Sequence, residues 1–281
     1  MKKTIAIQGY SGSFHHLAAI NQFGQDIDIE PCSTFRELFR KTQYDHEISI
    51  GLAAFENSIA GSILNNYSLL QKSSLMVTGE VYLPVAQHLL ALPGVKTKDI
   101  KEVHSHTMAL HQCAEFLDQF PWKQVESEDT AYSARHISEN RIKYAAAIGS
   151  SLAATLYHLR IIEENIHTEK TNYTRFLILQ RNASIEQQQN ANKASVYFEL
   201  PHQPGALARV LSIIASCKVN LSSIQSIPIA KNAWNYAFHA DMEFDNIKTF
   251  NSAISKITDH TKQLIIYGVY KQAEKVSRKD D

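Results

Sequence analysis

The stretch TNYTRFLILQ, residues 171–180, decides how the larger part of this chain folds. Phe176 to Leu179 form an unbroken apolar run, which is typical of a strand buried on both faces. Thr174 and Arg175 stand immediately before that run, on the side of a polar segment. A hydroxyl and a guanidinium at the mouth of a buried strand predict either a ligand site or a structural ion pair.

Strand-like and helix-like segments alternate from the N-terminus to about residue 182. The strand candidates include TIAIQ (4–8), ISIGLAAF (48–55) and YAAAIGSS (144–151), and helical spacing follows each of them. This alternation predicts an α/β fold in which helices cover parallel sheets. The strand region 75–92 is broken by Pro84, which makes it a natural crossover point. Periodicity leaves open whether there is one sheet or two lobes.

A second, smaller unit follows. Residues 183–193 are rich in Gln and Asn and lack an apolar period, so we interpret them as a linker. Residues 194–275 then give the order strand, helix, strand, strand, helix, strand, which is the ferredoxin-like βαββαβ arrangement. An α/β body with such a tail suggests a catalytic unit joined to a small-molecule sensor.

Composition narrows the function. The 281 residues are enough for two domains, and Lys+Arg and Asp+Glu balance at 28 each, so no global field favours nucleic acid or an anionic membrane. The three cysteines form no C-x-x-C pair, which suits a reducing cytosol. The start MKKTIAIQGY lacks the apolar core of a signal peptide, and no apolar run approaches the ~20 residues that cross a bilayer. We therefore expect a cytoplasmic protein without a membrane partner.

Four polar clusters occur where strands end or helices begin, the usual ligand edge of an open α/β sheet. They are GYSGSF (9–14), FENSIAGS (55–62), Ser105-His106 and NYTRF (172–176). Each also has a plain structural explanation, such as a glycine turn, a helix cap or a surface pair. Together they supply hydroxyls, amides and one guanidinium, which suits a pocket that holds a small dianion.

Other chemistries have weaker support. His104, His106 and His111 lack the spacing of a zinc site, so we expect no metal. GYSGSF is not the G-x-G-x-x-G of a dinucleotide site, and no G-x-S-x-G nucleophile elbow occurs.

Five ordered motifs carry a family resemblance. They are ENSIAGS (56–62), SHTMALHQC (105–113), EDTA (128–131), AAAIGSSLAATLY (145–157) and NYTRFLIL (172–179). In this order they resemble prephenate dehydratase. The tail segment GALARVLSIIASCKVNLSSIQSIP (205–228) looks like the ACT regulatory domain that follows in that family.

The resemblance implies the conversion of prephenate to phenylpyruvate, with loss of water and carbon dioxide, in phenylalanine biosynthesis. It implies a two-lobed, periplasmic-binding-protein-like catalytic region at 1–182, with an inserted lobe at about 79–160 and the active site between the lobes. It implies no cofactor. An ACT domain at 194–275 would bind L-phenylalanine as an allosteric effector, and the chain would form a homodimer or homotetramer.

The resemblance also assigns roles to residues. Thr174 would hydrogen-bond the leaving ring hydroxyl, and Arg175 would either clamp a carboxylate or form a structural ion pair. The catalytic candidates are Thr174, Glu56, Asn57, Ser58 and His106. The substrate-binding candidates are Ser11, Ser13, Phe14, Ser105, Gln112, Thr130, Ala131, Arg175 and Phe176. The effector-binding candidates are Gly205, Ala206, Leu207, Asn220, Leu221, Gln225, Ser226 and Pro228.

Departures from the family pattern leave parts of this assignment open. Tyr10 and His15 stand where the family usually has Pro and Ser, and His15 could alter the first anion site. The family's E-S-R-P reads Gln225-Ser226-Ile227-Pro228 here, which puts the identity of the effector in question. Two rival functions remain: an arogenate dehydratase, and a non-catalytic small-ligand receptor with a two-lobed body.

Overall fold

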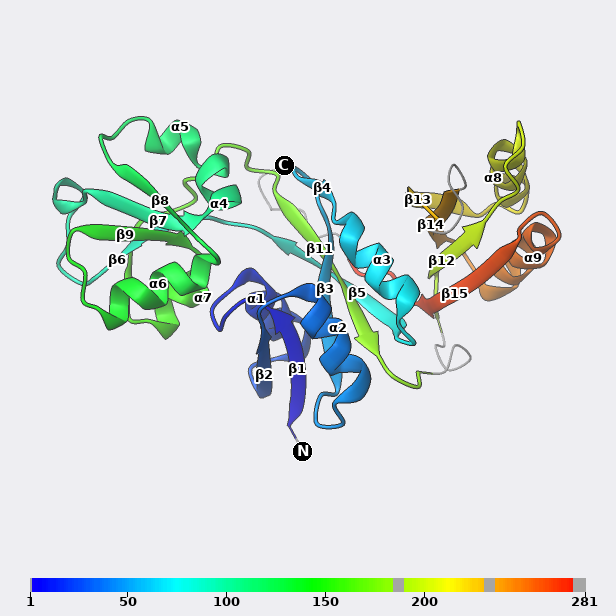
Figure 1. Ribbon diagram of the computed structural model, residues 1–281, viewed down its shortest axis with the longest axis horizontal. Helices are drawn as coiled ribbons and strands as arrows, with labels where there is room; N and C mark the ends of the chain where they lie inside the picture. Colours follow the sequence, from blue (N-terminus) through cyan, green and yellow to red (C-terminus); the bar gives the residue numbers. More distant parts are fainter. Residues whose placement is uncertain (1, 184–189, 230–235, 275–281) are drawn as a thin grey trace.

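A computed structural model describes residues 2–183, 190–229 and 236–274, which fold around three β-sheets (Figure 1). The first sheet has six strands in the order β2-β1-β3-β11-β5, with β4 paired to β3. Its elements are β1 (Lys3–Gln8), α1 (Phe14–Phe23), β2 (Ile27–Cys32), α2 (Phe35–Tyr44), β3 (Ile50–Asn57), β4 (Gly61–Ser62), α3 (Leu64–Lys72), β5 (Met76–Pro84) and β11 (Tyr173–Gln180).

The second sheet forms the other lobe, in the order β10-β6-β9-β7-β8. Its elements are β6 (His88–Ala91), the short 3-10 turn η1 (Thr97–Asp99), β7 (Glu102–His106), α4 (Thr107–Gln112), α5 (Ala114–Leu117), β8 (Lys123–Ser127), α6 (Thr130–Glu139), β9 (Ala145–Gly149), α7 (Ser151–Leu156) and β10 (Arg160–Glu163). The chain enters this lobe after β5 and returns through β11, so the second lobe is an insertion. Periodicity had left open one sheet or two, and the structure has two.

The inserted lobe begins later than expected. We placed its start at about residue 79, but β5 continues through Pro84 as a strand of the first sheet, paired along its length with β11. The reason is register: β11 runs antiparallel to both β3 and β5 and holds the outgoing strand in the first sheet until Pro84 pairs with Tyr173. The crossover at Pro84 lies where the sequence suggested.

The C-terminal domain has the βαββαβ order expected from the sequence. It comprises β12 (Lys193–Glu199), α8 (Ala206–Ser216), β13 (Asn220–Pro228), β14 (Tyr236–Glu243), α9 (Ile247–Thr258) and β15 (Gln263–Tyr270), with sheet order β13-β14-β12-β15. The expected linker ended at residue 193, but Lys193 is already in β12 and fully buried. Residues 184–189 of that linker, 233–235 of the alternating strand segment and residue 275 lie outside the described residues.

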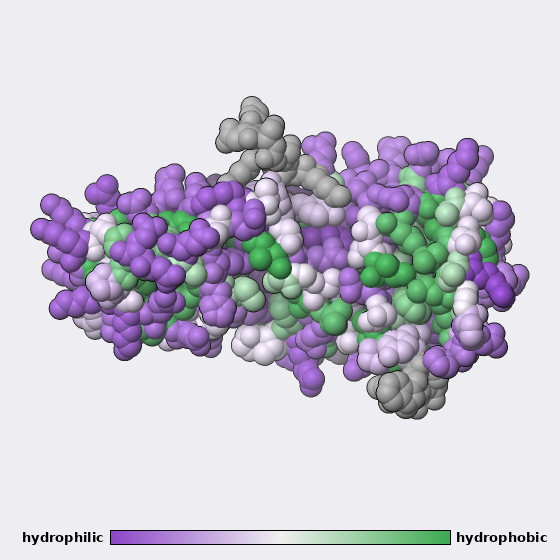
Figure 2. All heavy atoms as spheres, turned by 90° about the horizontal axis from the view of Figure 1, so that it is seen from above, coloured by the Kyte–Doolittle hydropathy of each residue, from purple (hydrophilic) through white to green (hydrophobic). Residues whose placement is uncertain are grey.

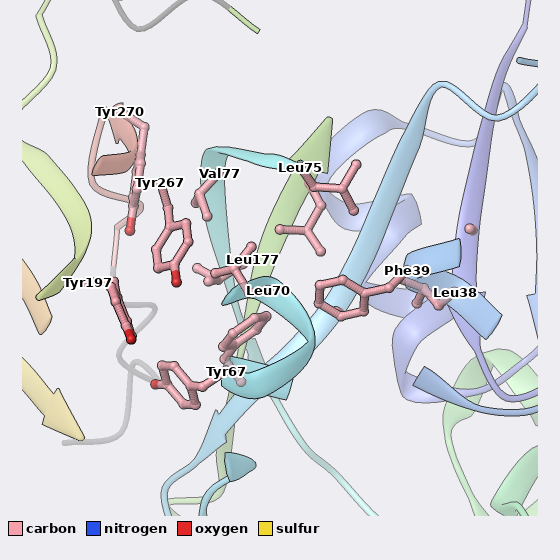
Figure 3. Packing of buried hydrophobic residues seen from close by; sticks show 14 of the residues in the cluster. Leu38, Phe39, Tyr67, Leu70, Leu75, Val77, Leu177, Tyr197, Tyr267 and Tyr270 are labelled. Carbon is pink, nitrogen blue, oxygen red and sulfur yellow. The ribbon is translucent and has the colours of Figure 1, made fainter. Parts of the chain in front are cut away.

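The third sheet packs directly against the first. Figure 3 shows Tyr197, Tyr267 and Tyr270 of the C-terminal domain facing Val77 and Leu177 of the first sheet. One buried cluster therefore includes side chains from both domains. A shared core of this kind makes the C-terminal domain a fixed neighbour of β5 and β11.

No helix in the described ranges is both long and apolar enough to cross a membrane. Within the same ranges, no three or more His, Cys, Asp or Glu side chains are grouped as metal ligands would be.

Candidate active site

A cleft of about 450 Å³ lies between the two lobes. The first lobe contributes the ends of β1 and β3, the starts of α1 and α2, and the mouth of β11. The second lobe contributes α4 and the start of α6. Predicted site residues that line the cleft are Ser13, Phe14, Asn57, His106, Gln112, Thr130, Thr174 and Phe176.

Thr174 and Asn57 form the centre of this cleft. They are partners in the β11–β3 ladder, and Asn57 Nδ2 donates to Thr174 Oγ1 at 3.1 Å. Asn57 Oδ1 accepts from the backbone N–H groups of Ile59 (3.0 Å) and Ala60 (2.8 Å), which fixes the orientation of the amide. Because the Thr174 oxygen accepts from Asn57, its own proton can be donated to a ligand.

An amide network extends from this pair into the second lobe. Asn57 Nδ2 donates to Asn172 Oδ1 at 2.7 Å, and Asn172 Nδ2 donates to Gln112 Oε1 at 3.2 Å. Gln87 Nε2 donates to the same Gln112 oxygen at 3.3 Å. Sequence reasoning missed Asn172 and Gln87, although Asn172 is inside the NYTRF motif and Gln87 follows the crossover proline. Both are polar residues in or next to segments that the sequence already marked, the NYTRF motif and the crossover at Pro84.

The glycine turn at 9–12 joins the lobes instead of binding an anion through Ser11. Tyr157 of the second lobe donates its hydroxyl to the Ser11 carbonyl at 2.5 Å, and Ser150 Oγ donates to the Gly12 carbonyl at 2.6 Å. A Cβ on Gly12, whose φ is +90°, would meet the Ala153 Cα at 3.1 Å. Ser11 therefore holds the lobes together and does not line the cleft. Ser13 does line it, and its Oγ caps α1.

Three more predicted contacts lie outside the cleft. Ser105 is fully buried, and its hydroxyl donates to the Ile148 carbonyl at 2.8 Å. Ala131 is fully buried in the first turn of α6. The Ser58 hydroxyl bonds to the Thr171 carbonyl at 2.9 Å and to the Tyr173 N–H at 2.9 Å, and it lies at a separate pocket. Both serine hydroxyls are therefore occupied by backbone groups distant in sequence, and Ala131 has no polar side chain to offer.

Glu56 and Arg175 also face away from the cleft. They are the next rung of the β3–β11 ladder, and consecutive residues of a strand point to opposite faces. A register shift follows Arg175, so Phe55 and Glu56 can both face the C-terminal domain while Ala54 and Asn57 line the cleft. Arg175 Nε contacts Glu80 at 2.6 Å, and its Nη1 contacts Asp241 at 2.5 Å. Arg175 thus forms the structural ion pair, one of its two expected roles, and its guanidinium lies at the separate pocket beside Ser58 and not in the lining of the cleft.

Two histidines lie at the cleft. His106 caps α4, with Nδ1 accepting from the Met108 N–H at 3.2 Å. The ring of His15 packs against Phe35 and Phe176, and its Nε2 is buried without a hydrogen-bond partner in the described residues. Burial lowers the pKa of His15 to about 3, so the ring is neutral near pH 7. His15 therefore brings an aromatic wall, and no charge, to the first anion site.

The charged groups of the cleft are carboxylates. Glu128 and Asp129 line it at the start of α6, and the described lining residues include no lysine or arginine. Asp129 Oδ1 accepts from the N–H groups of Ala131 (2.7 Å) and Tyr132 (3.0 Å). Burial raises the Asp129 pKa, and those two hydrogen bonds oppose the rise. Asp129 is also the N-cap residue of α6.

The predicted effector residues lie in two separate parts of the C-terminal domain. Gly205, with φ of +78°, caps α8, and Ala206 and Leu207 begin that helix. Asn220, Leu221, Gln225, Ser226 and Pro228 belong to β13, the edge strand of the third sheet. The 11 residues of α8 span about 16 Å between Gly205 and the turn that leads to Asn220. This length separates Gly205 from Asn220, at the start of β13.

Two α/β lobes around a cleft of hydroxyls, amides and carboxylates define a two-lobed protein that binds a small polar molecule. Comparison with known proteins narrows this class. The family model described as prephenate dehydratase matches residues 5–184. The chain belongs to the prephenate dehydratase family, which confirms the resemblance carried by the five motifs. The match ends before the C-terminal domain.

Curated relatives agree with this membership. The chain is 37% identical over 227 residues to arogenate dehydratase/prephenate dehydratase 1 of Arabidopsis thaliana, covering 81% of this chain and 57% of that one. It is 31% identical over 275 residues to the bifunctional chorismate mutase/prephenate dehydratase of Aquifex aeolicus, covering 97% of this chain and 74% of that one. The chain thus spans only part of each relative's length.

Solved structures confirm the predicted fold class. A structure titled as GqqA, a novel type of quorum quenching acylase, has a TM-score of 0.87 at 28% identity and covers 96% of this chain and 98% of its own. Prephenate dehydratase of Arthrobacter aurescens in complex with L-Phe has a TM-score of 0.85 at 26% identity, covering 95% of this chain and 90% of its own.

Proposed function

We propose that the interlobe cleft binds prephenate and converts it to phenylpyruvate. The observation that carries the proposal is the Thr174–Asn57 pair, which presents an oriented hydroxyl inside the cleft. The family membership supports the reaction class. Prephenate has two carboxylates, and the first turn of α1 opens onto the cleft beside Ser13. At α6 the Asp129 carboxylate already accepts from first-turn N–H groups, so the donor there is the Thr130 side chain. Positive helix ends and neutral donors can hold a dianion without a cationic side chain.

In the proposed reaction, the ring C–O bond breaks as the ring carboxylate leaves as carbon dioxide. The electron pair of the breaking C–C bond aromatises the ring, and the departing hydroxyl takes up a proton to leave as water. Thr174 donates a hydrogen bond to that oxygen while negative charge develops on it. A threonine is a poor acid near neutral pH, so its role is an oriented donor that stabilises the transition state.

Replacing Thr174 by Ala tests this role. We expect kcat for phenylpyruvate formation to fall about 100- to 1,000-fold, the usual cost of losing one donor to developing charge. Thr174→Ser keeps the hydroxyl and is the matched control, so it should retain most of the activity. The measurement is the absorbance of phenylpyruvate with purified protein, with circular dichroism to verify the fold. Full activity of a folded Thr174→Ala variant would remove the central assignment.

Arogenate is a second candidate substrate, and one specific observation favours it. Arogenate carries an ammonium where prephenate has a keto group, and Glu128 and Asp129 are carboxylates at the cleft. A carboxylate near an ammonium is a favourable pair, whereas near a dianion it is repulsive. The same assay run with both substrates decides between them through the ratio of kcat/KM. If neither substrate yields product, the receptor function replaces both.

We also propose that the C-terminal domain is an ACT domain that binds L-phenylalanine between two copies of the chain. The βαββαβ order and the retained Gly205-Ala206-Leu207 support the assignment. The relative from Arthrobacter aurescens was solved with L-Phe. In this proposal, α8 of one chain and β13 of the other contact the ligand from two sides. In Figure 2 apolar surface gathers over the C-terminal domain, whose edge strand exposes Ile224 by 37%. These features support a homodimer or homotetramer.

A further inference from the structure

Two adjacent rungs of the β3–β11 ladder serve two different sites. The rung Thr174–Asn57 faces the cleft, and the rung Arg175–Glu56 faces the C-terminal domain. A single peptide link joins the members of each rung to those of the next. Displacement of Arg175 or Glu56 therefore moves Thr174 or Asn57 directly.

The C-terminal domain holds both members of the second rung. Asp241 Oδ2 of β14 accepts from Arg175 Nη1 at 2.5 Å, and the Tyr270 hydroxyl lies 3.2 Å from Arg175 Nη2. Ser223 of β13 donates its hydroxyl to Glu56 Oε1 at 2.7 Å. The catalytic sheet contributes only Glu80 and Glu56 to the guanidinium, among the contacts of the described residues.

Because these contacts are buried, the loss of one partner is costly for the other. The side chains of Arg175 and Asp241 are 3% and 7% exposed, so water cannot replace a lost partner. Burial by itself would lower the Arg175 pKa and raise the Asp241 pKa, but their mutual attraction shifts both the other way. Both groups are therefore charged. The Ser195 hydroxyl donates to Asp241 Oδ1 and so holds the other oxygen of the same carboxylate.

We propose that Asp241 and Ser223 are positioning residues that set the geometry of the Thr174–Asn57 pair from the far side of the sheet, so that the C-terminal domain completes the active site. The proposal rests on the proposed function of Thr174. It predicts that weakening these contacts slows the chemical step without weakening substrate binding. No residue that lines the cleft needs to be substituted for this effect.

The test compares three variants of the full-length protein. Asp241→Asn keeps the shape of the side chain and removes its charge, and we expect kcat to fall about 10- to 100-fold with KM changed less than about twofold. Ser223→Ala acts on the partly exposed Glu56 and should lower kcat about threefold. Glu243→Gln is the matched control: it makes the same kind of change on β14, where Glu243 contacts Gln272 and Lys193 but not Arg175.

A second readout does not depend on turnover. In a spectrum of the protein with methyl-labelled threonine, the Thr174 signal is assigned by its loss in Thr174→Ala. That signal should shift in Asp241→Asn and Ser223→Ala and stay in place in Glu243→Gln. If wild-type protein has no activity but the signal shifts, the proposed function fails and the positioning role stands. An unmoved signal, unchanged kcat in a folded Asp241→Asn, or equal losses in the control would overturn the proposal. Should Asp241→Asn not fold, Ser223→Ala decides by the same two readouts.

Discussion

Single side chains in this protein differ sharply in role from their immediate neighbours. Thr174 contacts Asn57 at the cleft, and Arg175 is buried against Asp241 on the other face of the same strand. The strand's two-residue period separates them. The same alternation puts the side chains of Asn57 and Glu56 on opposite faces of the sheet. The motifs ENSIAGS and NYTRFLIL contain all four residues, but only Asn57 and Thr174 of the four line the cleft.

His15 gives a prediction at this scale. Its native pKa is about 3, below the ordinary 6.5, because burial disfavours the charged ring. Between those two pH values the unfolded chain binds a proton that the native ring does not bind, so the free energy of unfolding falls as pH falls. From pH 7 to pH 5, wild-type protein should lose up to about 2 kcal/mol more than His15→Leu.

Urea unfolding of both proteins at the two pH values measures this difference. His239, whose pKa burial lowers to about 4, titrates in the same direction in both proteins and cancels in the comparison. Parallel losses of stability in wild type and His15→Leu would show that the native ring accepts a proton readily.

At the scale of elements, the join between β5 and β15 fixes where the C-terminal domain lies. Gly268 of β15 sits against the β5 backbone so closely that an added Cβ would meet the Val77 carbonyl oxygen at 1.8 Å. Backbone atoms cannot move aside as a side chain can. The glycine therefore allows the approach that puts Asp241 against Arg175.

Gly268→Ala should destabilise the protein by about 1–3 kcal/mol, as overpacking of a core does, and should lower kcat along with stability. Gly79→Ala is the control, because its new Cβ would meet only the end of the Ile178 side chain, at 3.1 Å. Urea denaturation curves of the two variants measure the costs. Equal midpoints would mean that the two domains are not held by this contact.

The whole molecule combines three bodies, and each junction has its own chemistry. Hydrogen bonds from Tyr157 and Ser150 to the glycine turn join the two lobes around the cleft. An apolar cluster and a buried ion network join the C-terminal domain to the first lobe. A ligand that shifts the C-terminal domain can therefore displace β11 without itself entering the cleft.

L-Phenylalanine titrated into the full-length protein should release heat and lower kcat, because we propose that it binds the C-terminal domain. Isothermal calorimetry with D-phenylalanine as the control measures the specificity. Because this chain has Gln225-Ser226-Ile227-Pro228 where the family has E-S-R-P, L-tyrosine and L-tryptophan are titrated as well. Absence of heat with all three L-amino acids would contradict the effector assignment.

Local sequence patterns determined much of this protein. Apolar alternation predicted the α/β body, the crossover at Pro84 and the βαββαβ tail, because period and turn residues act within a few positions along the chain. Ordered motifs predicted the family and put Thr174 and Asn57 among the candidate site residues. These properties depend on residue type and spacing alone.

Only the tertiary structure decided which polar residues meet. The sequence could not assign Arg175 to Asp241, Ser11 to Tyr157, or Asn172 and Gln87 to Gln112, since each partner lies far along the chain or in another domain. Strand register, a bulge after Arg175 and the docking of a second domain set those pairs. The physical reason is that a side chain's face and partner follow from long-range packing, which local periodicity does not encode.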